Sequence, residues 1–381
     1  MKSAILGFGI VGSGAYDVLE NAGFEVKKVL DIRPHDELGE KLTGNFDDIL
    51  NDKEIEIVAE AIGGLEPAHT FLVKAIKAGK HVVSSNKHLI CTYYDELHSL
   101  AKENGVTIKF TSSAGGGIPW LYNLRRNARC DEISKIMGIM NGTTNFILDA
   151  MISDGRDFDE VLKEAQALGY AEANPSADID GLDTARKTAI SSSIAFNTII
   201  KEENVNVFSL RNIKKADVDY ITKKLNKTVR YLGFGVKCDD GACAFVEPAL
   251  LGSDALESNV SKNNNMISLF GKSVGRLSFF GQGAGKYPTG NSLAQDVIDI
   301  SLGDTKLEYA PTDLKIDNSL FKRKYYVRTS YQGALDFCDK VETIGDDRYI
   351  ITKEISVSKM HEIANTILKE DTHAFFAGIE E

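Results

Sequence analysis

The sequence has few cysteines, and their arrangement excludes the common cysteine-based sites. No CxxC pair occurs among the five, which are Cys91, Cys130, Cys238, Cys243 and Cys338. An odd and scattered set is typical of a reduced compartment, where thiols are buried as small apolar side chains. Cys238 and Cys243 are spaced like half of a metal site, but no second half follows, so we expect no metal there.

Positive charge is also in short supply. The chain has 44 Lys and Arg residues against 55 Asp and Glu residues, which gives a net charge of −11. Binding to a phosphate backbone or an anionic membrane needs a dense cationic face, which so acidic a chain is poorly suited to provide. We therefore expect a small-molecule substrate, and neither a nucleic acid nor a membrane as partner.

Long apolar runs are missing as well, and no segment is long enough to span a membrane. The apolar residues 3–11 after Lys2 could pass for a short signal peptide, but their glycine spacing favours a nucleotide-binding turn. A cytoplasmic protein is therefore the expectation.

What is present is the composition and pattern of an α/β protein. The 381 residues suffice for two domains and a smaller third one, and 43% are hydrophobic. Strand-like and helix-like segments alternate at the start, with strands expected at 3–6, 25–30, 55–62, 81–84 and 106–110 and helices at 12–21 and 66–78. This alternation predicts a Rossmann-type, doubly wound parallel sheet over residues 1–118.

The pattern changes after residue 118 and predicts an α+β domain over residues 119–285. Strands are expected at 132–140, 244–250 and 277–280, helices at 146–154 and from about 183 to 200, and loops at 263–265 and 281–285. A helix within about 286–302 is expected to pack back on the first domain. Residues 303–381 are expected to form a short α+β tail, with strands at 325–329 and 349–351 and a helix at 358–369.

A glycine fingerprint follows the first expected strand. It reads Gly7, Phe8, Gly9, Ile10, Val11, Gly12. Gly7 permits the turn, Gly9 lets a pyrophosphate approach the backbone, and Gly12 lets helix and strand pack closely. Asp31, 19 residues past Gly12, would accept hydrogen bonds from an adenosine ribose and favours NAD, whereas Arg33 could receive the 2′-phosphate of NADP. Arg33 could equally be an exposed loop charge.

Two lysines and a group of carboxylates are the remaining candidates. Lys87 follows the expected strand 81–84, at the sheet edge that faces the ligand crevice. Asp183 and Lys187 share one helix face at i,i+4 spacing, which an ordinary surface ion pair also shows. The carboxylates before this helix could cap it, or could bind calcium without the EF-hand spacing. They are Glu172, Asp178 and Asp180.

These motifs together resemble the homoserine dehydrogenase family over roughly residues 1–302. The residues that carry the resemblance are 7–12, 60–64, 86–87, 114–119, 138–145 (GIMNGTTN), 169–187 (GYAEANPSADIDGLDTARK) and 281–285. The resemblance implies NAD(P)H-dependent, reversible reduction of L-aspartate 4-semialdehyde to L-homoserine, in threonine, methionine and isoleucine biosynthesis. It also implies a homodimer.

The resemblance implies a role for each candidate. Lys187 would be the acid–base residue, and Lys87 a second essential lysine near the nicotinamide. Glu172, Asp178 and Asp183 would hold the substrate, and Gly63 and Gly285 would lie at the cofactor. Backbone carbonyls would hold a monovalent cation, Na⁺ or K⁺; here they belong to Thr111, Ala114, Gly116 and Ile118. The chain departs from the family at Thr111 and Asn174, where Glu and Asp are usual.

The tail resembles an ACT regulatory domain in its opening strand, residues 325–328, but the usual turn is replaced by residues 330–334. It could bind a feedback effector such as threonine, or could serve as a dimerising or packing module. Two other functions remain open at this point. Aspartate-semialdehyde dehydrogenase would need a thiolate nucleophile, for which no cysteine has a recognisable setting. A non-catalytic NAD(P)-binding amino-acid sensor would not need the paired lysines.

Overall fold

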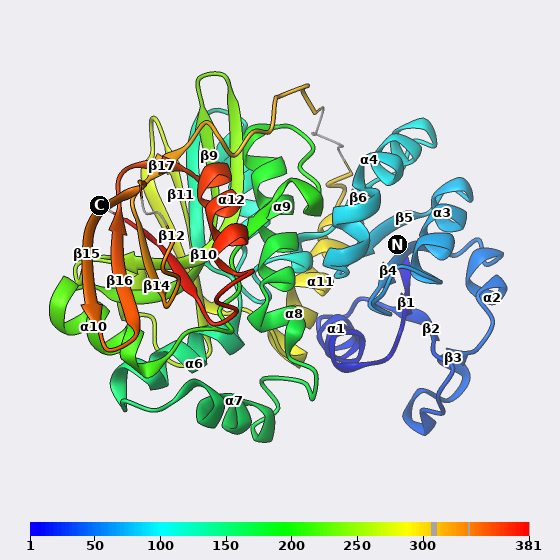
Figure 1. Ribbon diagram of the computed structural model, residues 1–381. Helices are drawn as coiled ribbons and strands as arrows, with labels where there is room; N and C mark the ends of the chain where they lie inside the picture. The colour runs from blue at the N-terminus through cyan, green and yellow to red at the C-terminus, as the bar shows by residue number, and fades with distance from the viewer. Residues whose placement is uncertain (306–310, 334–335, 381) are drawn as a thin grey trace. The chain divides into compact units, whose positions relative to one another are not determined.

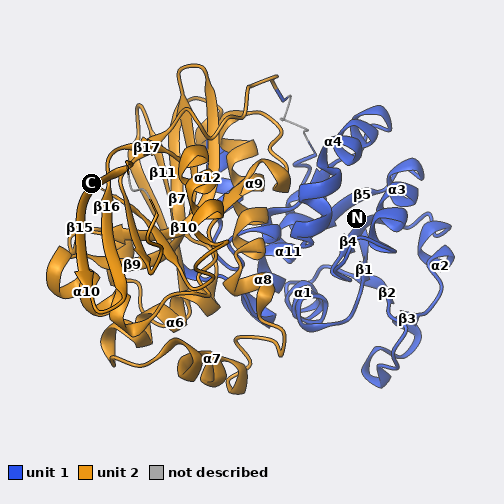
Figure 2. Cartoon of the chain, in the orientation of Figure 1, with its two compact units in different colours: residues 1–126, 281–311 blue, residues 127–280, 312–381 orange. Residues whose placement is uncertain are grey.

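A computed structural model of the chain describes residues 1–305, 311–333 and 336–380. The chain divides into two compact units (Figure 2). Unit 1 contains residues 1–126 and 281–311, and unit 2 contains residues 127–280 and 312–381. Within the described residues, no helix is both long and apolar enough to cross a membrane.

Unit 1 is built on a six-stranded sheet in which all neighbouring strands are parallel (Figure 1). The order is β3-β2-β1-β4-β5-β6, with β1 (Lys2–Leu6), β2 (Val26–Leu30), β3 (Leu42–Thr43), β4 (Ile55–Glu60), β5 (His81–Ser84) and β6 (Ile108–Lys109). The order reverses between β1 and β4, and ligands of such sheets bind at the carboxyl ends of the strands at this point. The predicted doubly wound parallel sheet is therefore confirmed.

The helices of unit 1 connect these strands or pack on them. They are α1 (Ile10–Asn21), α2 (Asp47–Leu50), α3 (Ala68–Lys77), α4 (Lys87–Glu103) and α11 (Lys286–Ser301), with α5 (Trp120–Ala128) at the end of the first segment. α11 packs along α1. Glycines make this close crossing possible, because a Cβ on Gly14 would lie 2.1 Å from the Lys286 carbonyl oxygen and one on Gly290 would lie 2.6 Å from the Ala15 nitrogen.

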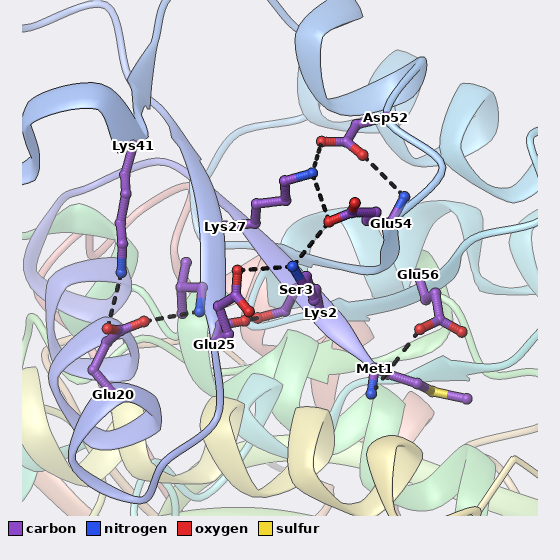
Figure 3. A network of polar contacts seen from close by, with 11 residues as sticks. Met1, Lys2, Ser3, Glu20, Glu25, Lys27, Lys41, Asp52, Glu54 and Glu56 are labelled. Carbon is purple, nitrogen blue, oxygen red and sulfur yellow. Dashed lines mark hydrogen bonds and ion pairs between the residues drawn. The ribbon is translucent and has the colours of Figure 1, made fainter.

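Ion pairs join the amino-end region of the unit 1 sheet, at the edge opposite the carboxyl ends (Figure 3). The Nζ of Lys2 lies 2.8 Å from a carboxylate oxygen of Glu54 and 3.3 Å from one of Glu25. The Nζ of Lys27 lies 2.6 Å from a carboxylate oxygen of Asp52 and 3.0 Å from one of Glu54. The two lysines hold the pKa of Glu54 below its usual value. Because these side chains are largely solvated, the network stabilises the unit only weakly.

Unit 2 contains a mixed sheet with ten strands among the described residues. The path is β12-β11-β7-β9-β10-β18-β14-β16-β15, and β8 pairs with β10. The strands are β7 (Ile133–Ile139), β8 (Asn206–Val207), β9 (Thr228–Cys238), β10 (Gly241–Leu251), β11 (Asn264–Gly271), β12 (Gly275–Gln282), β14 (Tyr325–Thr329), β15 (Cys338–Ile344), β16 (Asp347–Thr352) and β18 (Phe375–Ile379). β13 (Lys322–Arg323) and β17 (Ile355–Ser356) form a separate pair.

The helices of unit 2 are α6 (Gly142–Ser153), α7 (Phe158–Ala167), α8 (Ser176–Ile179), α9 (Leu182–Phe196), α10 (Lys215–Leu225) and α12 (Val357–Ile367). α9 is almost wholly buried and packs on β9. A Cβ on Gly233 would lie 2.0 Å from the Thr188 hydroxyl, and one on Gly235 would lie 2.2 Å from the Ser192 hydroxyl. Because β9 has glycine at these two positions, α9 can approach the sheet closely.

The tail strands extend the sheet of unit 2. Strand β18 pairs in parallel with β10 and in antiparallel with β14, and the order continues to β16 and β15. Buried Arg328 of β14 donates to the Asp217 carboxylate of α10 over 2.8 Å. The strands at 325–329 and 347–352 and helix α12 lie where the sequence predicts strands and a helix. Ala334, in the segment that replaces the usual ACT turn, lies outside the described residues, and the ACT-like character of the tail stays a prediction.

Two predicted loops are partly wrong. Strand β11 begins at Asn264, within the expected loop 263–265, where the Asn145 side chain donates to the Asn264 carbonyl over 3.3 Å. Strand β12 continues to Gln282, and the Gln282 carbonyl accepts from the Gly117 backbone N–H over 3.0 Å. In both places, contacts from residues distant in the sequence support the strand.

The buried imidazole of α12 gives the fold a pH dependence. His361 stacks on Phe208, with ring centroids 3.8 Å apart and planes 3° from parallel, and burial lowers its pKa to about 4. The unfolded chain binds this proton more tightly, so stability falls as the pH decreases from about 6.5 towards 4. We expect His361→Phe to remove roughly 2 kcal/mol of the difference in unfolding free energy between pH 7.5 and pH 5.

Urea unfolding of both proteins at the two pH values measures this difference, and the exposed His373 provides the matched control, as His373→Gln. Equal pH slopes in wild type and His361→Phe would show that the imidazole is not the cause.

Candidate active site

The glycine turn after β1 has the shape that a pyrophosphate needs. Gly7 has a φ of 92°, and a Cβ on Gly12 would lie 1.9 Å from the Gly7 carbonyl oxygen. By contrast, nothing lies within 4 Å of the position of a Cβ on Gly9. The turn is therefore closed where strand and helix meet and open at Gly9, next to the amino end of α1, where backbone N–H groups favour an anion.

Asp31, directly after β2, is bound on both carboxylate oxygens by its own chain. Oδ2 accepts from the Phe8 N–H over 2.7 Å and from Arg33 Nη2 over 2.9 Å. Oδ1 accepts from the Arg33 backbone N–H over 2.9 Å and from its Nε over 3.1 Å. The Arg33 guanidinium holds the pKa of Asp31 far below its usual range. Asp31 thus orients Arg33, whose side chain is 61% exposed.

Large apolar side chains are exposed in the segments that follow strands β1, β2 and β4. Ile10 is 71% exposed, Ile32 is 94% exposed and Ile62 is 37% exposed. Single exposed isoleucines are common on protein surfaces, but these three follow strands at the carboxyl edge of the sheet, where a ligand would bind. Ile10 and Ile62 belong to the motifs quoted from the sequence, whereas Ile32, directly after Asp31, belongs to none of them.

A buried carboxylate organises the loops after β4 and β5. Glu60 has no exposed surface, and burial raises its pKa. It accepts from the backbone N–H of Ile62 over 2.8 Å and of Gly63 over 3.2 Å, and from the Ser84 hydroxyl over 2.6 Å. Glu60 therefore ties the turn that contains Gly63 to the end of the neighbouring strand. In the sequence, Glu60 stood out only as part of the motif 60–64.

Asn86 connects the hydrogen bonds around Glu60 to the start of α4, where Lys87 lies. Its backbone N–H donates to the Ser84 hydroxyl over 3.1 Å, and its side chain donates to the Gly64 carbonyl over 2.5 Å. Its side-chain oxygen caps α4 by accepting from the Leu89 N–H over 3.2 Å. Lys87, partly buried, is the first residue of this capped helix. It therefore lies at the carboxyl edge of the unit 1 sheet, as predicted from its position after β5.

Gly285, the other predicted cofactor residue, precedes α11 in unit 1. It has a φ of 132° and is exposed, and its carbonyl accepts from the Thr289 N–H over 3.1 Å. Residues other than glycine rarely adopt this conformation.

The predicted cation ligands lie in the turn that follows β6. Two of the four oxygen atoms already accept a hydrogen bond, so a cation held by all four carbonyls would have to share these two with a protein donor. The Gly116 oxygen accepts from the Ser292 hydroxyl over 2.6 Å, and the Ile118 oxygen accepts from the Trp120 N–H over 2.7 Å. The side chain of Thr111 adds no carboxylate, and Ala114 is buried. The cation therefore stays a sequence prediction, and no step of the reaction is assigned to it.

Unit 2 buries an ammonium group. Lys187 of α9 is 7% exposed, and its Nζ donates to Asp183 Oδ2 over 2.8 Å and to the Met140 carbonyl over 2.7 Å. The helix starts after Gly181, where φ is 84° and a Cβ would lie 2.1 Å from the Tyr231 hydroxyl. The predicted i,i+4 pair is thus a buried pair and not the ordinary surface ion pair that its spacing also allowed.

Asn141, which the sequence presented only as part of the segment 138–145, completes this group. Its Nδ2 donates to Asp178 Oδ1 over 2.7 Å and to Asp183 Oδ2 over 3.0 Å, while its Oδ1 caps α6 through the Thr144 N–H over 2.9 Å. One amide therefore joins the NGTTN segment to two predicted substrate carboxylates. The helix was predicted to begin at 146, whereas α6 begins at Gly142, directly after Asn141.

The other carboxylates before α9 have different surroundings. Glu172 is exposed, and Asp180 pairs with Arg211 over 2.7 Å. Within residues 1–305, 311–333 and 336–380, no group of three His, Cys, Asp or Glu side chains could hold a metal ion. This does not support the calcium alternative. Lys87 lies in unit 1 and Lys187 in unit 2, and a shared substrate carbonyl stays a prediction.

Comparison with known proteins identifies the family. The family model described as "Homoserine dehydrogenase" matches residues 119–298, and the one described as "Homoserine dehydrogenase, NAD binding domain" matches residues 7–111. The homoserine dehydrogenase of Bacillus subtilis is 38% identical over 313 residues, which cover 78% of this chain and 72% of that protein. That of Pseudomonas aeruginosa is also 38% identical, over 79% of this chain and 72% of its own.

Solved structures agree. A homoserine dehydrogenase from Thiobacillus denitrificans matches with a TM-score of 0.89 at 30% identity, over 100% of this chain and 98% of that one. A hyperthermophilic archaeal homoserine dehydrogenase mutant in complex with NADPH matches with a TM-score of 0.68 at 27% identity, over 81% of this chain and 100% of that one. With a parallel-sheet NAD-binding domain and a buried lysine in its second unit, the chain belongs to the homoserine dehydrogenase family of oxidoreductases.

Proposed function

We propose that Lys187 is the acid–base residue for the interconversion of L-aspartate 4-semialdehyde and L-homoserine. The observation that carries this proposal is the burial of its ammonium between the Asp183 carboxylate and the Met140 carbonyl. An ammonium has three N–H donors, and these contacts use two of them. The third is left for the substrate oxygen.

The direction of the proton follows from the charge that develops. NADH or NADPH, when bound at the Gly7–Gly12 turn, would supply a hydride to the aldehyde carbon, which leaves negative charge on the carbonyl oxygen. Lys187 donates a proton to that oxygen, which becomes the alcohol of homoserine. In the reverse reaction the neutral amine takes the proton back. Asp183 keeps the side chain oriented through its hydrogen bond to Nζ.

We assign the other carboxylates to the substrate's amino-acid end. An α-ammonium needs an anionic partner, and Glu172 is exposed in the loop before α8. Asn141 orients Asp178 and Asp183 towards each other. Lys87, fixed by the cap of α4, would stabilise the developing negative charge as a second cation. A homodimer in the cytoplasm and an ACT-like role of the tail complete the proposal.

We further propose that the cofactor site accepts NADPH. Four hydrogen bonds, from the Phe8 N–H and from the backbone and side chain of Arg33, occupy the Asp31 carboxylate, which leaves it poorly placed to take a ribose diol. The exposed guanidinium of Arg33 keeps Nη1 for a 2′-phosphate. The related archaeal enzyme bound to NADPH supports this choice. Gly7 to Gly12 would receive the pyrophosphate, and Ile32 would lie beside the adenosine.

Lys187→Met tests the acid–base assignment. We expect kcat to fall roughly 10²–10⁴-fold, because general acid–base catalysis contributes about that factor, while the cofactor still binds. The test follows nicotinamide absorbance with aspartate semialdehyde, and nicotinamide fluorescence reports binding. Lys223 provides a matched control, since it also pairs at i,i+4 with an aspartate over 2.8 Å but is exposed. Lys223→Met should keep full activity; a similarly active Lys187→Met would remove the assignment.

Arg33→Ala tests the cofactor proposal. Loss of a charged hydrogen-bond partner should raise KM for NADPH by roughly 10- to 100-fold and change KM for NADH by less than about threefold. Steady-state kinetics with each cofactor measures both constants. An equal change for the two cofactors would mean that Arg33 does not read the 2′-phosphate.

A further inference from the structure

The turn of residues 111–118 joins β6 to α5 at the carboxyl edge of the unit 1 sheet. β6 is the neighbour of β5, which leads to Lys87. The conformation of this turn therefore bears on the cofactor side of the site. The resemblance to the family implies that a monovalent cation would be coordinated by the carbonyls of such a turn. In this structure, hydrogen bonds from helix α11 and from the segment before it hold the turn instead.

Helix α11 contacts the turn at two points one helical turn apart. The hydroxyl of Ser292 donates to the Gly116 carbonyl over 2.6 Å, and Asp296 Oδ2 accepts from the Thr111 backbone N–H over 2.7 Å. The two side chains are 5% and 2% exposed, so neither contact competes with bulk water. At i,i+4 spacing both lie on one face of the helix. One rigid element therefore fixes the turn at Thr111 and at Gly116.

The middle of the turn is held from the other side by the segment before α11. The Gly117 N–H donates to the Gln282 carbonyl over 3.0 Å. A Cβ on Gly116 would lie 2.2 Å from the carbonyl carbon of Gly283, so the two backbones are in close contact. Protein groups thus hold the Gly116 carbonyl and the N–H groups of Thr111 and Gly117, and the turn has little space to widen at Gly116.

We propose that Ser292 takes the place of a monovalent cation in this chain, so that the enzyme works without Na⁺ or K⁺. The Ser292 Oγ lies 2.6 Å from the Gly116 oxygen, and its hydroxyl proton puts positive charge against that oxygen, as a cation would do there. Thr111 contributes no carboxylate that would need a cation, and its N–H is already held by Asp296. Ser292 and Asp296 are positioning residues, since both act through the turn. The inference rests on the proposed function.

The experiment measures kcat and KM with aspartate semialdehyde and NADPH at constant ionic strength, in tetramethylammonium chloride, NaCl or KCl. For the wild type we expect differences below about twofold. Ser292→Ala should lose roughly 5- to 30-fold in kcat/KM in tetramethylammonium, because a buried carbonyl loses its donor, and should regain part of this in NaCl or KCl. Ser292→Thr, which keeps a hydroxyl, should match the wild type in kcat/KM in all three salts.

The matched control lies on the same helix. Ser301 donates only to the Val297 carbonyl, over 2.9 Å, so Ser301→Ala should stay insensitive to the cation. A calorimetric titration of the wild type with NaCl or KCl provides a readout apart from activity, and we expect no saturable heat. This titration and the wild-type salt comparison test the proposal even if Ser292→Ala does not fold.

Activation of the wild type by more than about tenfold in NaCl or KCl, or saturable cation binding, would overturn the proposal. So would a Ser292→Ala enzyme that matches the wild type in all three salts. A wild type without activity in any salt would instead contradict the proposed function, and the calorimetric result would still decide whether a cation binds.

Discussion

The interaction on which the account depends is the buried ammonium of Lys187. An isolated charge taken out of water is very costly, so it persists only with an anionic partner and hydrogen bonds in good geometry. Asp183 supplies the anion and the Met140 carbonyl the second acceptor. The close packing of α9 on β9, which Gly233 and Gly235 allow, keeps this arrangement rigid. The fold of unit 2 therefore positions one proton donor.

Unit 1 uses buried carboxylates in a different way. Glu60 and Asp296 each accept a backbone N–H from a loop at the carboxyl edge of the sheet. A buried carboxyl group that accepts backbone N–H groups fixes a loop firmly, because these hydrogen bonds are shielded from water. The loops that would surround the cofactor are thus held by acids that need not touch it.

Features set by local chain geometry could be predicted from the sequence. The glycine turn and strands β5 and β14 were predicted, the two strands with their observed bounds, because turn chemistry and short apolar runs suffice for them. Strand β9 was not predicted, since its glycines weaken the strand pattern and make sense only against α9. The roles of Asn141 and Asp296 were missed for the same reason: their partners are 37 to 185 residues away.

The most direct test of the central claim is a double-mutant cycle on kcat with Asp183→Asn, Lys187→Met and the two combined. If Asp183 acts on catalysis by holding the ammonium, its substitution should change kcat by less than about tenfold once Lys187 is gone, although it costs far more in the wild type. Losses that multiply in the double variant would show that the two side chains act independently, and would contradict the account.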